Sequence, residues 1–212
     1  MRDATTRWWL IRHAPVHAGG RMYGQQDLDA DTADGDTAAA LAAWLPAGAV
    51  WLTTPLCRTR QTAAALEAHL PDTPEPTPVR ALAEQHFGTW QGRTPAELMA
   101  EQPEAWRRFW AEPAASRPPA GESFADVVDR VGPTLATWSA AHPGRDIVAV
   151  VHGGTVRAAL ATALGVSPAH ALAFAVGTWS LTRLDRIPGA GANGGPAWRI
   201  AAVNTTPGTG GD

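Results

Sequence analysis

The chain has 212 residues, of which 45% are hydrophobic and 17% charged, and its formal net charge is -3. These values predict a globular protein with a full core, and they give no reason to expect nucleic acid as a partner. Cys57 is the only cysteine, which excludes an intramolecular disulfide and a thiolate metal cluster. Residues 1–7 lack the form of a signal peptide, and no run approaches the roughly 20 apolar residues of a membrane helix. We therefore expect no membrane partner and a cytoplasmic location.

Strands and helices are expected to alternate along the first half of the chain. Thr54 is followed by Pro55, a combination typical of a helix N-terminus in which a hydroxyl group caps the first turn. A segment with four prolines after that helix indicates a loop. The predicted elements are a strand at 8–12, a helix at 36–45, a strand at 49–53, a helix from 55 to about 70, and a loop at 71–78.

The second half predicts three helical segments and further strands. Pro103 interrupts a helical pattern at 94–110, and Pro133 is expected to bend or split a helix at 124–141. The continuous apolar run at 147–151 is typical of a strand buried in a parallel sheet. The other expected elements are a connection at 113–120, a helix at 156–164, strands at 171–176, 180–185 and 197–203, and a hairpin loop at 188–196.

This alternation predicts an α/β protein with three layers, α/β/α, around a mainly parallel sheet. We expect one domain, 1–204, with a helical, cap-like insertion at about 93–120. The segment 205–212 is expected to be a disordered tail.

The first predicted strand ends in the pair Arg12-His13. In open α/β folds, the carboxyl ends of the strands form the edge of the sheet where ligands bind. A guanidinium group matches phosphate oxygens, and a neighbouring imidazole is a nucleophile or a general base. The pair alone also fits two ordinary polar residues at a strand end, so its meaning depends on what else converges on it.

Two further segments carry chemistry of the same kind. Arg58 lies in the first turns of a helix whose free N–H groups and dipole attract anions, although a capped surface helix with an exposed arginine fits the same pattern. Glu84 lies in a loop among apolar and aromatic residues. Such neighbours disfavour the charged form of a carboxyl group, which suits a general acid, whereas the alternative is a solvated loop carboxylate.

The fourth segment, His152-Gly153-Gly154, follows the strand at 147–151 and repeats the placement of His13. The two glycines allow the backbone to approach a ligand closely, although a structural histidine and a tight turn fit as well. The segment lacks the G-x-G-x-x-G fingerprint, so we expect no nucleotide cofactor. His13 and His17 lack the glutamate of a zinc-binding H-E-x-x-H motif, so we expect no metal site there.

Together and in this order, the four segments resemble the histidine phosphatase superfamily, also called the phosphoglycerate mutase-like family. Its members typically carry Leu-hydrophobic-Arg-His-Gly, Ser-Pro-x-x-Arg-x-x-x-Thr, Glu-x-x-x-Gly-x-Trp-Glu-Gly and His-Gly-Gly. The resemblance covers residues 8 to about 185 and implies a phosphoglycerate mutase-like fold. The matching segments are 10–14, 54–62, 84–92 and 152–154, with Gly121-Glu122-Ser123 and Arg157 at lesser family positions.

The resemblance implies a role for each of five residues. His13 attacks phosphorus in line and forms a phosphohistidine. Arg12, Arg58 and His152 hold the three equatorial oxygens of the phosphoryl group as its charge redistributes. Glu84 protonates the departing alkoxide and then deprotonates the water that releases phosphate. Four positive groups around the anion remove the need for a metal, and no cofactor is implied.

Three departures from the family pattern concern the surroundings of these residues. Ala14 replaces the usual glycine, and Gln91 replaces the second glutamate of the third motif, which is expected to matter little outside the contact shell. A family asparagine shortly after the nucleophile has no counterpart. A phosphate contact is then expected from Thr155, from the loop 21–24, or from backbone groups.

The substrate is predicted to be a small-molecule phosphate ester. Mutases of this family carry an arginine where Gln85 stands, and this chain has no lysine for a second charged group, which favours a phosphatase. Among phosphatases the resemblance is to α-ribazole phosphatases of cobalamin synthesis, through segments at 23–24, 121–124 and 174–180. The predicted substrate-binding residues are Arg12, Arg58, His152, Gly153, Tyr23, Trp106 and Trp110.

Alternatives remain open for both the activity and the aromatic residues. They are phosphoglycerate mutase-type phosphotransfer, a phosphoprotein (phosphohistidine) phosphatase with an open site, and a catalytically weak phospho-ligand-binding module. Trp106 and Trp110 at helical spacing also fit a helix that simply buries its aromatic face. A homodimer is possible, because dimerisation through an edge strand or an apolar helix leaves no sequence signature.

Overall fold

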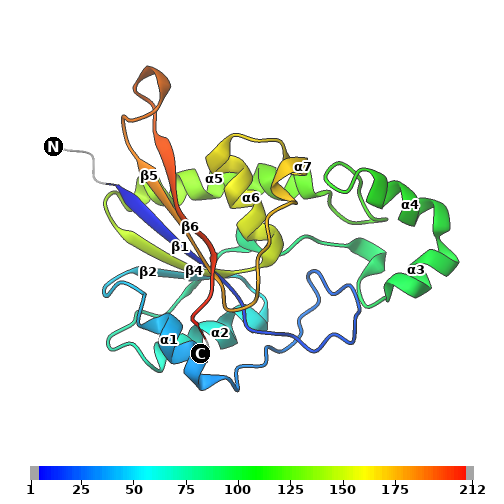
Figure 1. Ribbon diagram of the computed structural model, residues 1–212, viewed down its shortest axis with the longest axis horizontal. Helices are drawn as coiled ribbons and strands as arrows, with labels where there is room; N and C mark the ends of the chain where they lie inside the picture. The colour runs from blue at the N-terminus through cyan, green and yellow to red at the C-terminus, as the bar shows by residue number, and fades with distance from the viewer. Residues whose placement is uncertain (1–4, 209–212) are drawn as a thin grey trace.

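The computed structural model describes residues 5–208, in which six strands form one sheet in the order β3-β2-β4-β1-β5-β6 (Figure 1). The pairs β1–β4, β2–β4 and β2–β3 are parallel, whereas β5 and β6 extend the sheet by antiparallel pairing. The prediction of a mainly parallel sheet in an α/β fold is therefore confirmed. The strands are β1 (Thr6–Arg12), β2 (Val50–Thr53), β3 (Thr77–Pro78), β4 (Asp146–Val151), β5 (Leu181–Ile187) and β6 (Ala197–Thr205).

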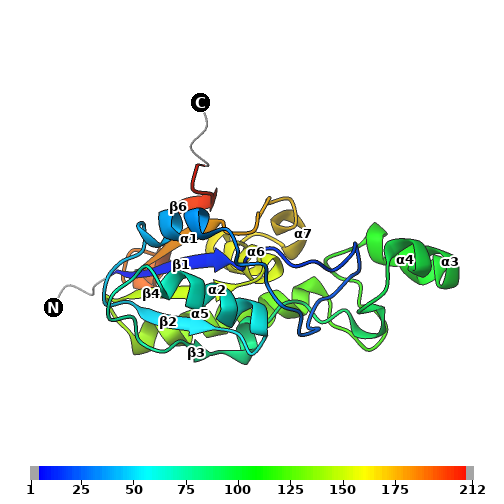
Figure 2. The ribbon, with the colours of Figure 1, turned by 90° about the horizontal axis from the view of Figure 1, so that it is seen from below.

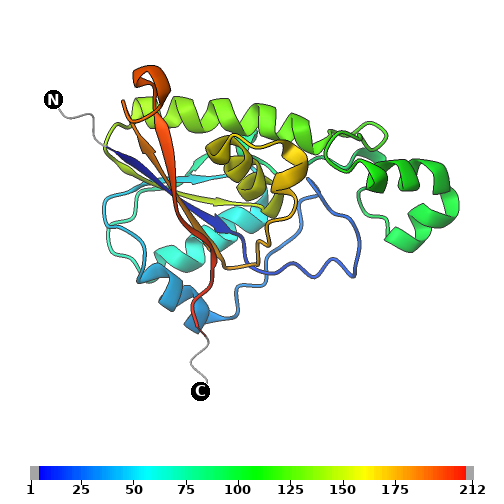
Figure 3. The same cartoon turned by 45° about the horizontal axis from the view of Figure 1, so that its top comes forward.

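Helices cover both faces of this sheet (Figures 1 and 3). One face carries α1 (Gly35–Ala42) and α2 (Cys57–Glu67). The other face carries α5 (Phe124–Ala141), α6 (Gly153–Leu164) and the short α7 (Pro168–Ala171). Among the described residues no helix is long and apolar enough to cross a membrane.

Side chains of the central strands alternate between the two faces. Trp8 and Leu10 of β1 pack in the core beneath α5 and α6, whereas Ile11 packs in the core beneath α1 and α2. In β4, Ile147 and Val148 divide between the same two cores. A strand buried on both faces needs an uninterrupted apolar sequence, which is why both strands were recognisable as apolar runs.

Two helices lie beyond the end of the sheet, α3 (Pro95–Glu101) and α4 (Pro103–Ala111) (Figure 2). Thr94 caps α3 with a capping box, and Pro103 begins α4, so the predicted interruption at Pro103 is confirmed. The helices pack on a small core of their own, which contains Trp90 and Phe109. The division into one domain with an insertion at about 93–120 stays a prediction.

The predicted strand at 171–176 is wrong. Ala171 ends α7, and the following residues form turns before β5 begins. An apolar run of six residues does not by itself distinguish a strand from other buried structure. Here the backbone carbonyls of Phe174 and Val176 accept hydrogen bonds from the side chains of Arg157 and Arg12 instead of pairing in a sheet.

Smaller corrections concern element boundaries. The expected loop at 71–78 contains β3, which pairs with β2, and α5 is not split at Pro133. Thr205 belongs to the expected tail but pairs with Leu181 as the last residue of β6. The rest of that prediction falls partly on residues 209–212, which lie outside the described residues.

Two helix starts also differ from prediction, and both bear on the site. Thr54 is not an N-cap, because α2 begins at Cys57 after Leu56, and no side chain caps it. α6 begins at Gly153, three residues before the predicted start, so both glycines lie in its first turn. Their N–H groups therefore belong to the unpaired donors of a helix N-terminus.

Candidate active site

His13 lies directly after β1 at the carboxyl edge of the sheet and is 1% exposed. Its backbone N–H donates to the carbonyl of Val151 in β4, which ties it to the neighbouring strand end. The ring Nδ1 lies 2.7 Å from the carbonyl oxygen of Ala14. Since a carbonyl only accepts hydrogen bonds, Nδ1 carries the proton, and Nε2 is left with the lone pair of a nucleophile.

His152 follows β4 and is fully buried, with its ring centroid 5.2 Å from that of His13. Its Nε2 lies 2.9 Å from the hydroxyl oxygen of Thr54, and its buried Nδ1 has no hydrogen-bond partner among the described residues. Thr54, expected to cap a helix, thus holds a predicted site residue. Its contact with His152 spans 98 positions, and the sequence carries no signal for it.

Two arginines complete the group around His13. Arg58, fully buried, donates through its two Nη atoms to the carbonyls of Gln26 and Gly24, at 2.8 and 2.6 Å. Arg12 donates through Nη1 to the carbonyl of Val176. In both residues the buried Nε has no partner among the described residues. These contacts orient both guanidinium groups and leave each with an unused donor.

Charge in this part of the site comes from the arginines. Burial lowers the pKa of His13 to about 3; the hydrogen bond to Ala14 opposes this shift, and the charges of Arg58 and Arg12 add to it. Burial, followed by the charge of Arg58, also lowers the pKa of His152 well below its usual value. The sequence predicted four positive groups, but both imidazoles are neutral near pH 7. A neutral His13 is the form that a nucleophile requires.

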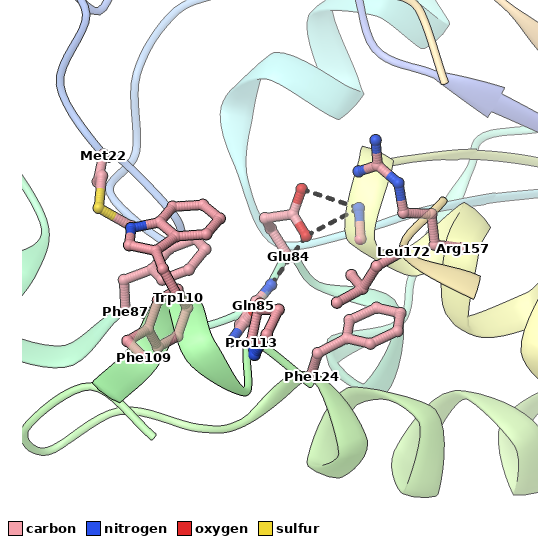
Figure 4. Close-up of a pocket in the computed structure, with 11 residues that line it drawn as sticks. Met22, Glu84, Gln85, Phe87, Phe109, Trp110, Pro113, Phe124, Arg157 and Leu172 are labelled. Carbon is pink, nitrogen blue, oxygen red and sulfur yellow. Dashed lines mark hydrogen bonds between the residues drawn. The ribbon is translucent and has the colours of Figure 1, made fainter. Parts of the chain in front are cut away.

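Glu84 lies in the loop after β3, and its carboxylate accepts hydrogen bonds from the backbone of α6. The N–H of Gly154 lies 3.1 and 3.2 Å from its two oxygens, and the N–H of Gln85 lies 2.9 Å from one of them (Figure 4). The surroundings are therefore not only apolar as predicted, because two backbone N–H groups also contact the carboxylate. A Cβ atom on Gly154 would lie 2.2 Å from a carboxylate oxygen, so this contact requires glycine there.

The contacts of Arg130 that hold the Glu84 loop, called the brace below, were not predicted. Arg130 of α5 pairs with Glu122 at 2.8 Å and also donates to the carbonyls of Glu84 and Ala81. The hydroxyl of Thr155 donates to the carbonyl of Leu82. Thr155 was one expected phosphate contact, but its hydroxyl is used to hold this loop. Glu122 had been noted as a lesser family position, whereas nothing in the sequence marked Arg130.

Gln91, expected to matter little, joins the two loops that flank Glu84. Its side-chain oxygen accepts from the N–H of Gln25 at 2.7 Å and from that of Phe87 at 3.3 Å. Gln25 in turn donates to the carbonyl of Glu84 at 2.8 Å. The replacement of glutamate by glutamine thus leaves a structural link between these loops.

A pocket of about 360 Å³ opens beside Glu84 (Figure 4). Its wall is mostly apolar and aromatic, and Glu84 lies in the view between a cluster of aromatic side chains and Arg157. His13, Arg12, Arg58 and His152 are absent from the wall. The pocket therefore adjoins the site on the side of Glu84. It is lined by Met22, Glu84, Gln85, Phe87, Phe109, Trp110, Pro113, Phe124, Gly154, Arg157 and Leu172.

The predicted substrate-binding residues divide between this pocket and its surroundings. Trp110 lines it and is 55% exposed, whereas Trp106 packs against Trp90 and lines a neighbouring pocket that also contains Glu84. The ring of Tyr23 lies beneath the guanidinium of Arg58, 5.0 Å from the ring centroid. A Cβ atom on Gly153 would lie 3.6 Å from Nε of Arg12, so this glycine lies against that guanidinium.

Comparison with known proteins identifies the family. A sequence model of the Histidine phosphatase superfamily (branch 1) matches residues 8–193. Glucosyl-3-phosphoglycerate phosphatase of Mycolicibacterium vanbaalenii is 35% identical over 169 residues, which are 74% of this chain and 73% of the relative. Metal-independent phosphoserine phosphatase of Arabidopsis thaliana is 32% identical over 156 residues, 70% of this chain and 65% of the relative.

The fold resembles that of a solved structure. The crystal structure of a putative α-ribazole-5'-P phosphatase from Escherichia coli superposes with a TM-score of 0.79, covering 96% of this chain and 97% of the other. At 24% identity this likeness concerns the fold alone. The family match covers most of the chain, and both curated relatives are phosphatases. The chain therefore belongs to the histidine phosphatase superfamily and is a phosphatase of that family.

Proposed function

We propose that the protein hydrolyses small-molecule phosphate monoesters without a metal, through a phosphohistidine on His13. The observation that carries this proposal is the group of three buried, unpartnered nitrogen atoms beside the nucleophile: Nε of Arg12, Nε of Arg58 and Nδ1 of His152. Buried polar groups in proteins are normally paired, so three such atoms beside His13 point to a ligand with several acceptors. The three equatorial oxygens of a transferring phosphoryl group supply them.

The first chemical step transfers the phosphoryl group to His13. Nε2 attacks phosphorus, the bond from phosphorus to the ester oxygen breaks, and protonated Glu84 gives its proton to the departing alkoxide. Arg12 and Arg58 stabilise the charge that spreads over the equatorial oxygens. In the second step the Glu84 carboxylate takes a proton from water, whose oxygen attacks phosphorus. The bond to Nε2 then breaks, and phosphate is released.

We further propose which phosphate ester is the physiological substrate. α-Ribazole 5′-phosphate is the substrate expected from the sequence, and the aromatic wall of the pocket beside Glu84 suits its flat base. The curated relatives are named for two other esters, glucosyl-3-phosphoglycerate and phosphoserine. The leaving group of all three would occupy the pocket that contains Glu84, because this residue delivers the proton to the leaving oxygen.

The test is phosphate release from p-nitrophenyl phosphate in excess EDTA, with His13→Asn compared with the wild type. We expect EDTA-resistant turnover that falls by at least about 10⁴-fold in the variant, as for loss of an enzymatic nucleophile. Rapid quenching in base should trap a phosphoprotein in the wild type only. His17→Asn is the matched control, because its ring is 82% exposed and hydrogen-bonds only to Asp31 among the described residues.

Two results contradict the proposal. One is full activity of His13→Asn, which would remove the phosphohistidine route. The other is the absence of turnover on p-nitrophenyl phosphate and on the three named esters between about pH 5 and 9, where general acid–base catalysis by these groups operates. That second result would favour the binding-module alternative.

A further inference from the structure

Asn204 of β6 is a polar residue outside the candidate site, and its backbone conformation is unusual. Its φ is 53°, in the left-handed region that asparagine tolerates better than most residues with a side chain. The register between β5 and β6 shifts across this residue, from the pair Leu181–Thr205 to the pair Arg183–Ala202. Such bulges re-aim side chains at the edge of a sheet. Here the side chain of Asn204 meets the segment that precedes β5.

The contact of Asn204 with this segment fixes one peptide group. The N–H of Gly177 donates to Oδ1 of Asn204 at 2.6 Å. The carbonyl of the same peptide group belongs to Val176, and it accepts a hydrogen bond from Nη1 of Arg12. Asn204 and Arg12 therefore hold the two ends of one peptide group, although they lie near opposite ends of the chain. Hydrogen bonds in such a series polarise one another.

The peptide group between Val176 and Gly177 depends on these two side chains for its orientation. Among the described residues, neither its carbonyl nor its N–H has a backbone partner. The regular pairing with β1 begins only afterwards, where the N–H of Arg12 donates to the carbonyl of Ser180 at 3.0 Å. Without Asn204, this peptide group would be free to rotate and to carry its carbonyl away from Arg12.

The position of that carbonyl matters because it orients a donor of the candidate site. Nε of Arg12 is buried and has no partner among the described residues, and the proposed function assigns it to a phosphoryl oxygen. A guanidinium group is planar, so a hydrogen bond at Nη1 also sets the direction of the N–H at Nε. Donors stabilise a transition state most when they are fixed in advance. The Val176 carbonyl therefore helps to decide where this donor points.

We propose that Asn204 is a positioning residue for phosphoryl transfer, which acts by holding the peptide group that orients Arg12. This inference rests on the proposed function and adds to it a residue that does not touch the substrate. Arg12 contacts the phosphoryl group, which all phosphate monoesters share. The loss of Asn204 should therefore slow the hydrolysis of different esters by the same factor.

The experiment compares Asn204→Gly with the wild type on p-nitrophenyl phosphate and on glycerol 3-phosphate. Glycine accepts the left-handed backbone and removes only the side-chain amide. Complete loss of one such donor costs about 10²- to 10³-fold in kcat, and a donor that is kept but no longer fixed should cost less. We expect kcat/KM to fall by about 5- to 30-fold on both esters. Asn204→Asp keeps an acceptor for Gly177 and should recover most of this loss.

A double-mutant cycle separates positioning from a general structural loss. In the Arg12→Gln background, Asn204→Gly should have no further effect, because the guanidinium that it orients is gone. Inhibition by inorganic phosphate should weaken in Asn204→Gly and show the same dependence on Arg12. Asn193→Gly is the matched control, because Asn193 is exposed, has a φ of 56° and lies in the hairpin loop away from the site. Asn204→Ala replaces Asn204→Gly in the cycle if the glycine variant does not fold.

Three results overturn the inference while leaving the phosphatase intact. They are wild-type kcat/KM in Asn204→Gly, equal losses in Asn204→Gly and Asn204→Asp, and the same fold-loss in the wild-type and Arg12→Gln backgrounds. If the wild type hydrolyses neither ester, the proposed function itself fails.

Discussion

The two sides of the candidate site are built from different parts of the molecule. The proposed phosphoryl side consists of His13, Arg58 and His152, which are at most 1% exposed and lie at the ends of β1 and β4 and in α2. The proposed leaving-group side has a mixed wall, in which Phe124 of α5 is 1% exposed and Trp110 of α4 is 55% exposed. Changes on the buried side disturb packed secondary structure, whereas a change at Trp110 alters a surface.

In the proposed function, the buried sheet edge carries out the phosphoryl transfer, and the pocket beside Glu84 selects the substrate. A transferring phosphoryl group needs donors that are fixed in advance in surroundings of low dielectric, which a buried sheet edge supplies. Selectivity needs a surface that varies without loss of the fold, and loops and exposed helices supply that. Glu84 belongs to both parts of the site, because it lines the pocket and its carboxylate accepts hydrogen bonds from Gly154 in α6.

Gly154→Ala tests that anchor and should have the largest effect of the four changes below. The added Cβ would lie 2.2 Å from a Glu84 oxygen and must displace the carboxylate. We expect kcat on alkyl esters such as glycerol 3-phosphate to fall by about 10²- to 10⁴-fold, the range of general acid–base catalysis. The loss on p-nitrophenyl phosphate should be smaller, because that leaving group needs less protonation.

Gly35→Ala is the matched control for this change, since a Cβ on that residue meets nothing within 4 Å and its φ is not positive. Steady-state kinetics on both substrates provide the measurement. Wild-type kcat in Gly154→Ala on glycerol 3-phosphate would show that Glu84 does not act from its position against Gly154.

Arg130→Met tests the brace behind the Glu84 loop. The substitution removes the ion pair of the partly buried Glu122, which keeps only the N–H of His86, and it removes donors to the carbonyls of Ala81 and Glu84. We expect the free energy of unfolding to fall by about 2–3 kcal/mol, measured by urea unfolding. The kcat for glycerol 3-phosphate should also fall more than that for p-nitrophenyl phosphate, because the general acid is displaced.

Arg117→Met is the control for this brace. Arg117 lies in the loop before α5 and pairs with Asp126 of that helix. Its side chain is 64% exposed, so we expect a loss of at most about 1 kcal/mol. Equal destabilisation by the two substitutions would mean that Arg130 is an ordinary surface residue.

Because His13 and His152 are buried, we expect the free energy of unfolding to decrease in acid. The pKa of His13 is about 3 in the folded protein, while an unperturbed histidine titrates near 6.5. Between these values the unfolded chain binds a proton that the folded chain does not, so the free energy of unfolding falls as the pH falls. The slope is at most about 1.4 kcal/mol per pH unit for each such histidine, and His152 shifts in the same direction.

Urea unfolding across this pH window, in the wild type and in His13→Asn, provides the measurement. The variant should lose the His13 part of the slope, whereas His17→Asn, whose ring is 82% exposed, should keep the wild-type slope. Parallel slopes in wild type and His13→Asn would show that His13 is not held neutral by the fold.

Trp110→Ala should have the smallest effect. We expect KM for an aromatic ester to rise about 3- to 10-fold, corresponding to about 1 kcal/mol of lost contact, with little change in kcat. Trp44→Ala is the control, because Trp44 is 38% exposed and does not line the pockets that contain Glu84. Similar KM changes in both variants would indicate that α4 does not contact the leaving group.

The fold class and the order of the site segments were predictable from the amino-acid sequence alone. A buried strand must be apolar along its length, so the polar residue that ends it is visible, and this is how His13 and His152 were found. Arg58 was singled out at a helix N-terminus and Glu84 in an apolar loop, and the resemblance to a family pattern gave both a role. These features are local, since each depends on neighbours within a few residues.

How those residues are held depends on contacts between distant segments. α6 starts at Gly153, and the N–H of Gly154 in its first turn donates to Glu84, 70 positions away. The segment 171–176 is not a strand, and the carbonyls of Phe174 and Val176 accept from Arg157 and Arg12. Hydrogen bonds between distant segments leave no period in the sequence, so only the folded chain reveals which donor meets which acceptor.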